Sequence, residues 1–311
     1  MAAYATLASL SFLWGSSFLL IKVASRAFDP FGFALARVGV AAAALLAASA
    51  LSGKVWPGSR PGLWAKLVAL ALFGQVIPFI LLGQAATLTT SADMALMMGA
   101  QPIFVFLFGR FLGSRDRWTW LAALGLAIGF AGVAVAFWSP GAGGGGHSAL
   151  GRAFALAAGI LYGTSAIISG AATREIGAVR AVTASMTLST LVLTLIGLAL
   201  GKLPPPATVF QTPLAPMLAM GALGVFNTAL AYYVYFRIVH DEGPTFASLN
   251  NYIVPVIGVI GGAIALAEPI APSAWAGLAL VLCGVALTGR SLRPAKASQA
   301  RLATTRARAN C

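Results

Sequence analysis

The chain consists largely of uninterrupted apolar segments, each about twenty residues long. A helix of about twenty residues crosses the hydrocarbon core of a bilayer, whereas a membrane β-strand alternates polar and apolar residues over about ten positions. Because only helices and closed barrels satisfy the backbone in lipid, these segments predict an all-α polytopic membrane protein. We expect ten transmembrane helices, at about 5–26, 31–52, 63–86, 92–112, 118–138, 149–171, 179–201, 214–238, 245–266 and 272–290.

The composition excludes several classes of soluble protein. Of the 311 residues, 59% are hydrophobic and only 9% are charged, whereas a soluble domain carries about 25% charged residues. This excludes a soluble enzyme, a disordered chain and an ordinary nucleic-acid-binding protein, although the net charge is +13. Cys283 and Cys311 have no plausible pairing partner, and no Cys/His cluster has metal-ligand spacing. We therefore expect no metal and no other cofactor.

Basic residues set the expected orientation, because they accumulate on the cytoplasmic side of a membrane. The segment 291–311 is rich in arginine and is expected to be a disordered cytoplasmic tail. Ten helices then place both termini in the cytoplasm, with fifteen basic residues inside, four outside and one, Arg37, within a helix. The expected partners are the lipid bilayer and a small-molecule substrate, without nucleic acid. The choice between monomer and homodimer stays open.

The two halves of the chain can be laid over each other. Residues 14–17 (Trp-Gly-Ser-Ser) match residues 162–165 (Tyr-Gly-Thr-Ser) at an offset of 148, and Pro102 matches Pro255 at an offset of 153. Because five is an odd number, a second five-helix unit enters the membrane from the opposite side. Such inverted repeats are typical of secondary transporters with a substrate site near the midplane. The expected units are a first repeat at 1–138, a Gly-rich external linker at 139–148 and a second repeat at 149–290.

Polar side chains at membrane depth indicate where the substrate site lies, because such groups are costly in lipid. Gln75 and Phe79 share a face of the third predicted helix, and the repeat matches them with Thr228 and Tyr232. Taken singly, such an amide or hydroxyl is more often an interhelical contact worth about 0.6 kcal/mol. The clustering of these groups in paired helices, beside prolines that interrupt the fourth and ninth helices, favours a cavity.

Charged residues within or near the predicted helices have a less specific interpretation. Lys22 and Arg37 are expected to extend their side chains toward the outer surface, with a ligand carboxylate as the alternative partner. Asp93 and Glu268 fall at the outer ends of helices, so no acid lies near the middle of any helix. The sequence therefore predicts no buried carboxylate site for a coupling proton or sodium ion, and transport driven mainly by the substrate gradient.

These features resemble the EamA-type domains of the drug/metabolite transporter superfamily over about residues 5–290. One departure is the loop after the fourth helix, where the family often has a Gly-Glu pair and this chain has Gly113-Ser114-Arg115-Asp116. The residues that carry the resemblance are the 14–18 motif Trp-Gly-Ser-Ser-Phe, Lys22, Pro30, Arg37, residues 91–95, Gln101, Pro102, Pro255, and the glycines 125, 132, 277 and 284.

The resemblance implies a ten-helix carrier of the bacterial inner membrane that works by alternating access. It implies export or exchange of small metabolites, above all amino acids, as in the YddG-type exporters, with drugs, sugars or nucleotide sugars as the alternative. In the family, a subset of the helices lines the central cavity. The polar and aromatic residues of the corresponding helices in this chain are the expected substrate-binding residues, namely Trp14, Ser17, Gln75, Phe79, Met98, Gln101, Tyr162, Asn227, Tyr232, Asn250 and Asn251.

A membrane enzyme and a channel are the alternatives to a carrier. A membrane enzyme needs paired aspartates or a Ser/His pair at depth, but His147 falls in the predicted linker and His240 lies beside an inner loop. A channel needs a ring of carbonyls or acids, and no segment of this sequence resembles one. We therefore expect a transporter and not an enzyme.

Overall fold

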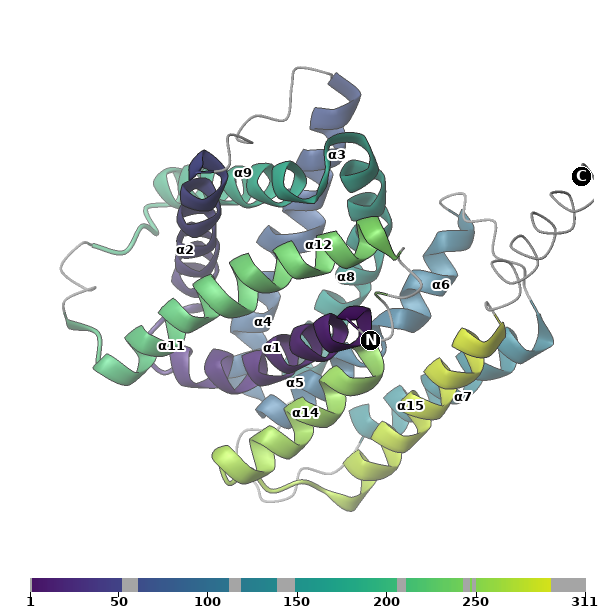
Figure 1. Cartoon of the computed structure of the whole chain (residues 1–311). Helices are drawn as coiled ribbons and strands as arrows, with labels where there is room; N and C mark the ends of the chain where they lie inside the picture. The colour runs from purple at the N-terminus through teal and green to yellow at the C-terminus, as the bar shows by residue number, and fades with distance from the viewer. Residues whose placement is uncertain are drawn as a thin grey trace, which may run out of the picture.

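A computed structural model describes residues 2–51, 61–111, 119–138, 149–205, 211–242, 247 and 250–291. Across these ranges the chain is helical with connecting turns and has no strand, so the predicted all-α class is confirmed (Figure 1). The linker predicted at 139–148 and the tail predicted from 291 onward lie almost wholly outside the described residues.

The helices of the first half are α1 (Ala2–Ala24), α2 (Pro30–Leu51), α3 (Pro61–Ala71), η1 (Leu72–Val76), α4 (Ile77–Leu88), α5 (Ser91–Met98), α6 (Gln101–Phe111) and α7 (Trp120–Phe137). Those of the second half are α8 (Ala149–Ile176), α9 (Ala178–Ala199), α11 (Leu214–Gly224), η2 (Val225–Leu230), α12 (Ala231–Asp241), α14 (Asn250–Ala265) and α15 (Pro272–Ser291).

The lengths of the helical runs agree with membrane crossing. In the described part of the chain, eight runs are long and apolar enough to span a bilayer, the η1 and η2 segments being continuous with their neighbours. Two further apolar helices are shorter, Ile253–Ala265 and Pro272–Thr288. Eight to ten apolar helices confirm a polytopic membrane protein.

The two prolines matched by the repeat have different effects on their helices. Pro102 follows a break, because α5 ends at Met98 and α6 begins at Gln101, with a turn at Gly99 and Ala100. Pro255, in contrast, lies inside the continuous helix α14. A proline removes one backbone donor and crowds the preceding turn, and only in the first half does the helix separate there.

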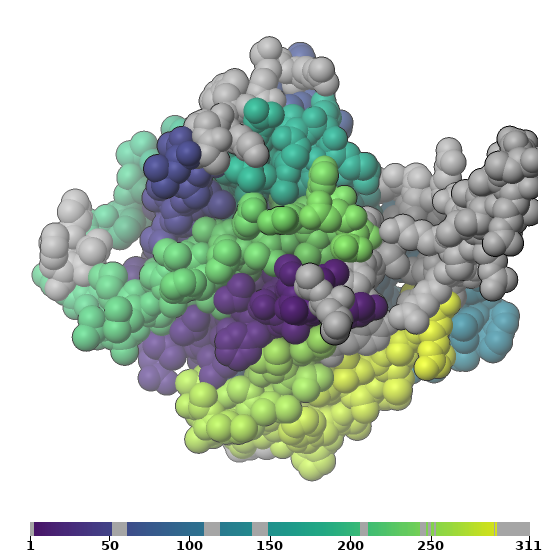
Figure 2. Space-filling model, viewed as in Figure 1, coloured from purple at the N-terminus to yellow at the C-terminus, as the bar shows by residue number. Residues whose placement is uncertain are grey.

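Helices from the two halves pack against each other throughout the bundle. Helix α1 packs against α14, α11 and α12, and α8 packs against α3, α4, α5 and α6. Helix α2 also packs against α9. Helices α7 and α15 pack against each other at one side of the molecule (Figure 1). On the face seen in Figure 2, α1 lies between α12 and α14, which it contacts.

Glycines allow the backbones of α7 and α15 to touch. A Cβ atom added at Gly132 would lie 2.8 Å from the carbonyl oxygen of Gly277, and one added at Gly277 would lie 2.9 Å from that of Gly132. One added at Gly125 would lie 2.7 Å from the carbonyl oxygen of Gly284. Small residues at such crossings are the usual means of close packing in membranes. The glycines at this crossing therefore serve helix packing.

Candidate functional site

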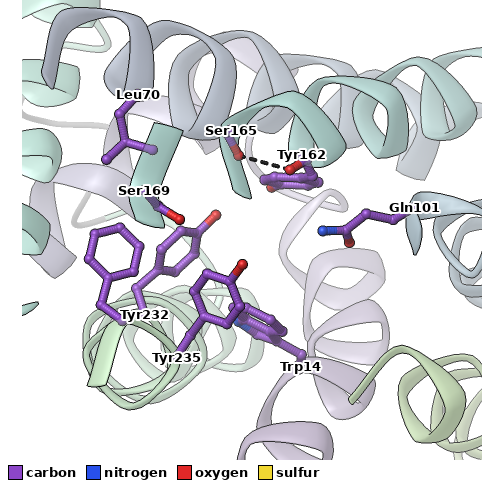
Figure 3. Close-up of a pocket in the computed structure, with 9 residues that line it drawn as sticks. Trp14, Leu70, Gln101, Tyr162, Ser165, Ser169, Tyr232 and Tyr235 are labelled. Atoms are coloured by element: carbon purple, nitrogen blue, oxygen red, sulfur yellow. Dashed lines mark hydrogen bonds between the residues drawn. The ribbon is translucent and has the colours of Figure 1, made fainter. Parts of the chain in front are cut away.

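A central cavity lies where helices of both halves meet, and it has two adjoining lobes. The lobes measure about 70 Å³ and about 20 Å³ and share Trp14, Gln101, Tyr162 and Tyr232 in their walls. A single water needs about 10–15 Å³ by this measure, so the larger lobe holds roughly five. Figure 3 shows these four side chains, from α1, α6, α8 and α12, around a common space. The cavity thus has the mixed apolar and polar walls of a small-ligand site.

Two π-helical segments stand beside the cavity, one in each half of the chain. Segment η1 joins α3 to α4 and contains Gln75, and η2 joins α11 to α12 and contains Asn227 and Thr228. A π-helical turn is rare, occurs often at functional sites, and shifts backbone carbonyls out of the regular ladder. One carbonyl, that of Gly74, accepts a hydrogen bond from the Tyr232 hydroxyl at 3.0 Å. This bond links η1 to α12, the helix that follows η2.

Arg37 enters the bundle from α2 and lines the larger lobe. Its side chain is buried, with 3% of the residue exposed. The Nε group donates to Thr228 Oγ1 at 2.8 Å, and the guanidinium carbon lies 4.1 Å from the centre of the Phe79 ring. The prediction that Arg37 extends to the outer surface is therefore wrong. Helix α2 packs against η2 and α4, which turns this position toward the interior.

Aromatic rings form much of the wall on the side of α1 and α12. The rings of Trp14 and Tyr232 meet edge to face with centroids 5.7 Å apart, and Trp14 lies 5.0 Å from Tyr235. The Phe79 ring lies 6.5 Å from both Tyr162 and Tyr232. Such contacts add stability beyond burial and hold the rings in place. The cavity wall is therefore largely preformed.

The predicted site residues divide into three groups in the structure. Seven of them line the cavity, namely Trp14, Ser17, Met98, Gln101, Tyr162, Tyr232 and Asn251. Phe79 stacks beneath the guanidinium of Arg37. The other three, Gln75, Asn227 and Asn250, are buried outside the two lobes. Substrate binding by any of the eleven stays a prediction.

The three amides outside the lobes are buried, and two of them bond to a neighbouring helix. Gln75 accepts a hydrogen bond from Ser189 at 3.2 Å, while its Nε2 group is buried without a partner. Asn227 donates to the Leu13 carbonyl and to Ser16 Oγ. Asn250 has a buried Oδ1 atom without a partner. Asn227 therefore acts as a contact between helices, which is the plainer of the two roles weighed from the sequence.

Sequence reasoning missed part of the cavity wall. Ser165 and Ser169 follow Tyr162 at three and seven positions on α8, and that helical spacing was a usable signal. Arg37 is the only charged residue of α2, which was a second signal. The remaining lining residues absent from the predicted set are Phe18, Leu70, Leu82, Val254, Pro255, Tyr235 and Phe236.

A second group of buried charges lies where α4 ends and α5 begins. Asp93 Oδ2 lies 3.3 Å from Arg152 Nε and accepts a hydrogen bond from Thr89 Oγ1 at 2.8 Å. The Nη1 group of Arg152 donates to the Phe137 carbonyl at 2.7 Å. We call these three side chains, Asp93, Arg152 and Thr89, the helix-end cluster. Its charges are matched by partners within the protein.

Two further charged side chains adjoin the helix-end cluster. Lys22 donates to the carbonyls of Ala86 at 2.8 Å and Thr89 at 2.6 Å, and so holds the end of α4 instead of extending freely outward as predicted. Glu268 accepts from the Ser91 hydroxyl at 2.7 Å and from the Ser91 backbone at 3.0 Å. A carboxylate at a helix N-terminus is stabilised by the free N–H groups there. Within the described residues, no group of three His, Cys, Asp or Glu side chains is placed to hold a metal ion.

Comparison with known proteins places the chain in a family. The sequence matches the EamA-like transporter family over residues 1–138 and 149–290. An uncharacterized inner membrane transporter of Escherichia coli K12, YedA, is 26% identical over 295 residues, which are 94% of this chain and 93% of that protein. An uncharacterized transporter of Archaeoglobus fulgidus is 23% identical over 302 residues, covering 93% of this chain and 99% of its own.

A solved structure supports the same fold. One crystal structure superposes with a TM-score of 0.66 at 20% sequence identity, and the match covers 94% of this chain and 98% of that one. At this identity the likeness concerns the fold alone. With two family matches that cover nearly the whole chain, and with the apolar helices around a central cavity, the protein is a membrane transporter that belongs to the EamA-like transporter family.

Proposed function

We propose that this transporter is a secondary carrier of the bacterial inner membrane that exports or exchanges small metabolites, with amino acids as the first candidates. The observation that carries the proposal is the central cavity. Its walls combine Phe18, Leu82 and Val254 with the polar side chains of Arg37 and Gln101. A wall of this kind suits a small ligand that has an apolar part and a few polar groups.

The proposed mechanism is alternating access between two inverted five-helix repeats. Segments η1 and η2 begin at Leu72 and Val225, an offset of 153 that equals the offset between Pro102 and Pro255. The packing is also reciprocal, because α1 contacts α11, α12 and α14, while α8 contacts α3, α4 and α5. Both features support a pseudo-twofold arrangement with the substrate between the halves.

The inverted arrangement makes a topological prediction that labelling tests. Both termini are expected in the cytoplasm and the linker 139–148 outside. In a Cys283→Ser background, a cysteine at Gly144 should react with an impermeant thiol reagent in intact cells, and Cys311 should react only after permeabilisation. Cys283 is replaced because it is exposed in the structure. Labelling of Cys311 in intact cells would contradict the orientation.

Transport itself is tested by uptake into proteoliposomes. A labelled panel of amino acids, sugars and cationic drugs is offered with and without gradients of protons and sodium, and protein-free liposomes serve as the control. Saturable uptake of amino acids supports the proposal. Saturable uptake of a sugar or drug alone points to the alternative substrates, flux without saturation points to a channel, and a chemically altered ligand points to an enzyme.

The panel also tests how transport is driven. Two acids at the ends of helices are already engaged, since Asp93 pairs with Arg152 and Glu268 binds the start of α5. We therefore expect uptake to follow the substrate gradient when both ion gradients are collapsed. Strict loss of uptake under that condition, with the substrate gradient held constant, would contradict this expectation.

A further inference from the structure

Arg37 is a buried cation whose hydrogen bonds are incomplete. A guanidinium has five N–H donors, and among the described residues the side chain makes one hydrogen bond, from Nε to Thr228. Its Nη1 group is fully buried without a hydrogen-bond partner. A charged group inside a membrane protein is costly unless it is paired or used for a ligand. The free donors of Arg37 therefore need an explanation.

No carboxylate of the described residues neutralises Arg37. The buried acid Asp93 pairs with Arg152, and Glu175 pairs with Lys66 near the far end of α8. The walls of the two cavity lobes contain no acidic side chain, and Arg37 is the one charged residue among the described residues that line them. The unmatched positive charge consequently faces the space that a ligand would occupy.

The guanidinium is held in place before any ligand binds. The Phe79 ring supports one face at 4.1 Å, and Thr228 in the π-helical segment η2 fixes the Nε edge. A planar group held by stacking and one hydrogen bond presents its remaining N–H donors as a rigid fork. Such a fork matches a carboxylate, which accepts two parallel N–H bonds.

We propose that Arg37 binds the carboxylate of the substrate, and that this carrier selects compounds with one negative charge next to an apolar portion. The inference rests on the proposed function, because it names the substrate class of the same cavity. One cation suits one negative charge, whereas a phosphate ester brings about two charges and three strong acceptors. Phe18, Leu82 and Val254 offer the apolar part of the ligand a surface.

The same geometry assigns a lesser role to an amino group on the substrate. The lobes contain no acid to pair with an ammonium, which leaves the ring faces of Trp14 and Tyr162 and the side-chain oxygens of Gln101 and Asn251. A carboxylate is therefore required and an ammonium is optional. This separates the inference from a general preference for amino acids.

Matched probes on the purified protein test the role of Arg37 without any transport assay. Binding of leucine, leucinamide, 4-methylpentanoate and isopentyl phosphate is followed by thermal shift and by tryptophan fluorescence, since Trp14 lines the cavity. We expect leucine and 4-methylpentanoate to bind within a few-fold of each other. Leucinamide should bind about ten- to a hundredfold more weakly, as expected when a charge-assisted hydrogen bond is lost.

Variants of Arg37 assign the preference to one side chain. Arg37→Gln should abolish the discrimination between 4-methylpentanoate and leucinamide, and Arg37→Lys should keep part of it because the charge remains without the fork. Arg237→Gln is the matched control, because Arg237 is 65% exposed in its side chain and pairs with Asp241 at the end of α12. This control should bind all four probes as the natural sequence does.

Several outcomes would overturn the inference. They are equal binding of leucinamide and 4-methylpentanoate by the natural sequence, binding of neither carboxylate probe, tighter binding of isopentyl phosphate, or a carboxylate preference that survives in Arg37→Gln. If both Arg37 variants fail to fold, the comparison of probes on the natural sequence still decides. Saturable uptake without a carboxylate preference refutes only the role of Arg37. Carboxylate binding without saturable uptake refutes only the carrier.

Discussion

Two regions of the bundle hold buried arginines, and they differ in how the charge is matched. In the helix-end cluster, Arg152 has Asp93 and the Phe137 carbonyl as partners. In the central cavity, Arg37 has Thr228, the Phe79 ring and an Nη1 group without a partner. Both side chains are almost fully buried. Burial alone therefore does not distinguish the two arginines, whereas a paired carboxylate does, because Arg152 has one and Arg37 has none among the described residues.

The largest expected effect comes from breaking the helix-end cluster. Arg152→Ala leaves the Asp93 carboxylate buried without its ion pair, which typically costs about 3–5 kcal/mol. We expect a strong fall in melting temperature of the purified protein and a lower yield from membranes. The double variant Asp93→Ala, Arg152→Ala should lose less than the sum of the single variants, because no lone charge remains. Additive losses would show that the two side chains do not act as a pair.

The opposite result is expected at Arg37. Arg37→Met removes an unmatched buried charge, whose desolvation costs several kcal/mol, and keeps a long side chain against Phe79. The melting temperature should therefore hold or rise, while carboxylate binding is lost. A fall as large as that of Arg152→Ala would mean that Arg37 is a structural residue, and would remove the contrast between the two regions.

The amides give a smaller effect that separates ligand contacts from helix contacts. Gln101 lines both cavity lobes, whereas Asn227 bonds to Leu13 and Ser16 of α1. Gln101→Ala should weaken binding by a few-fold to tenfold, the equivalent of about 0.5–1.5 kcal/mol for one hydrogen bond, at an unchanged melting temperature. Asn227→Ala should lower the melting temperature and leave affinity unchanged in the folded fraction.

Asn251→Ala extends this test to the second half of the chain, because Asn251 lines the larger lobe. It should behave as Gln101→Ala does. Measuring affinity and melting temperature on the same preparations keeps the two effects apart. If Gln101→Ala and Asn251→Ala lower only the melting temperature, both amides are helix contacts and the assignment of the site is wrong.

Much of the fold was predictable because it depends on the composition of long segments. Apolar runs of helix length, separated by turn signals, predict membrane helices from the requirements of the lipid alone. The glycines 125, 132, 277 and 284, which carried the family resemblance, lie at the crossing of α7 and α15, where no side chain fits. The break before Pro102 was predicted too, since proline removes a backbone donor, but the interruption expected at Pro255 was wrong, because α14 is continuous there.

The direction in which a side chain points was harder to predict. The sequence gives the depth of Arg37 in its helix but not the face it occupies, because α2 is rich in alanine and apolar all round. Gln75 and Asn227 lie in the π-helical segments η1 and η2, which depart from the regular helical ladder, and both are buried outside the two lobes. Neither effect follows from a regular 3.6-residue period. The inward-facing arginine and the burial of these amides outside the lobes were missed for this reason.

The smallest expected effect concerns an ion pair at the margin of the bundle, and it tests burial as the variable that separates the regions. Lys66 Nζ lies 2.7 Å from Glu175 Oε2, and the side chains are 42% and 22% exposed. The distance is shorter than the 3.3 Å between Arg152 and Asp93, so distance alone would rank this pair as the stronger. Water competes for the exposed ammonium, and such pairs contribute about 0.2–1 kcal/mol. Lys66→Ala should therefore shift the melting temperature only slightly, and the shift should shrink further at high salt. A loss comparable to that of Arg152→Ala would show that separation of the charges, not burial, governs the stability of both regions.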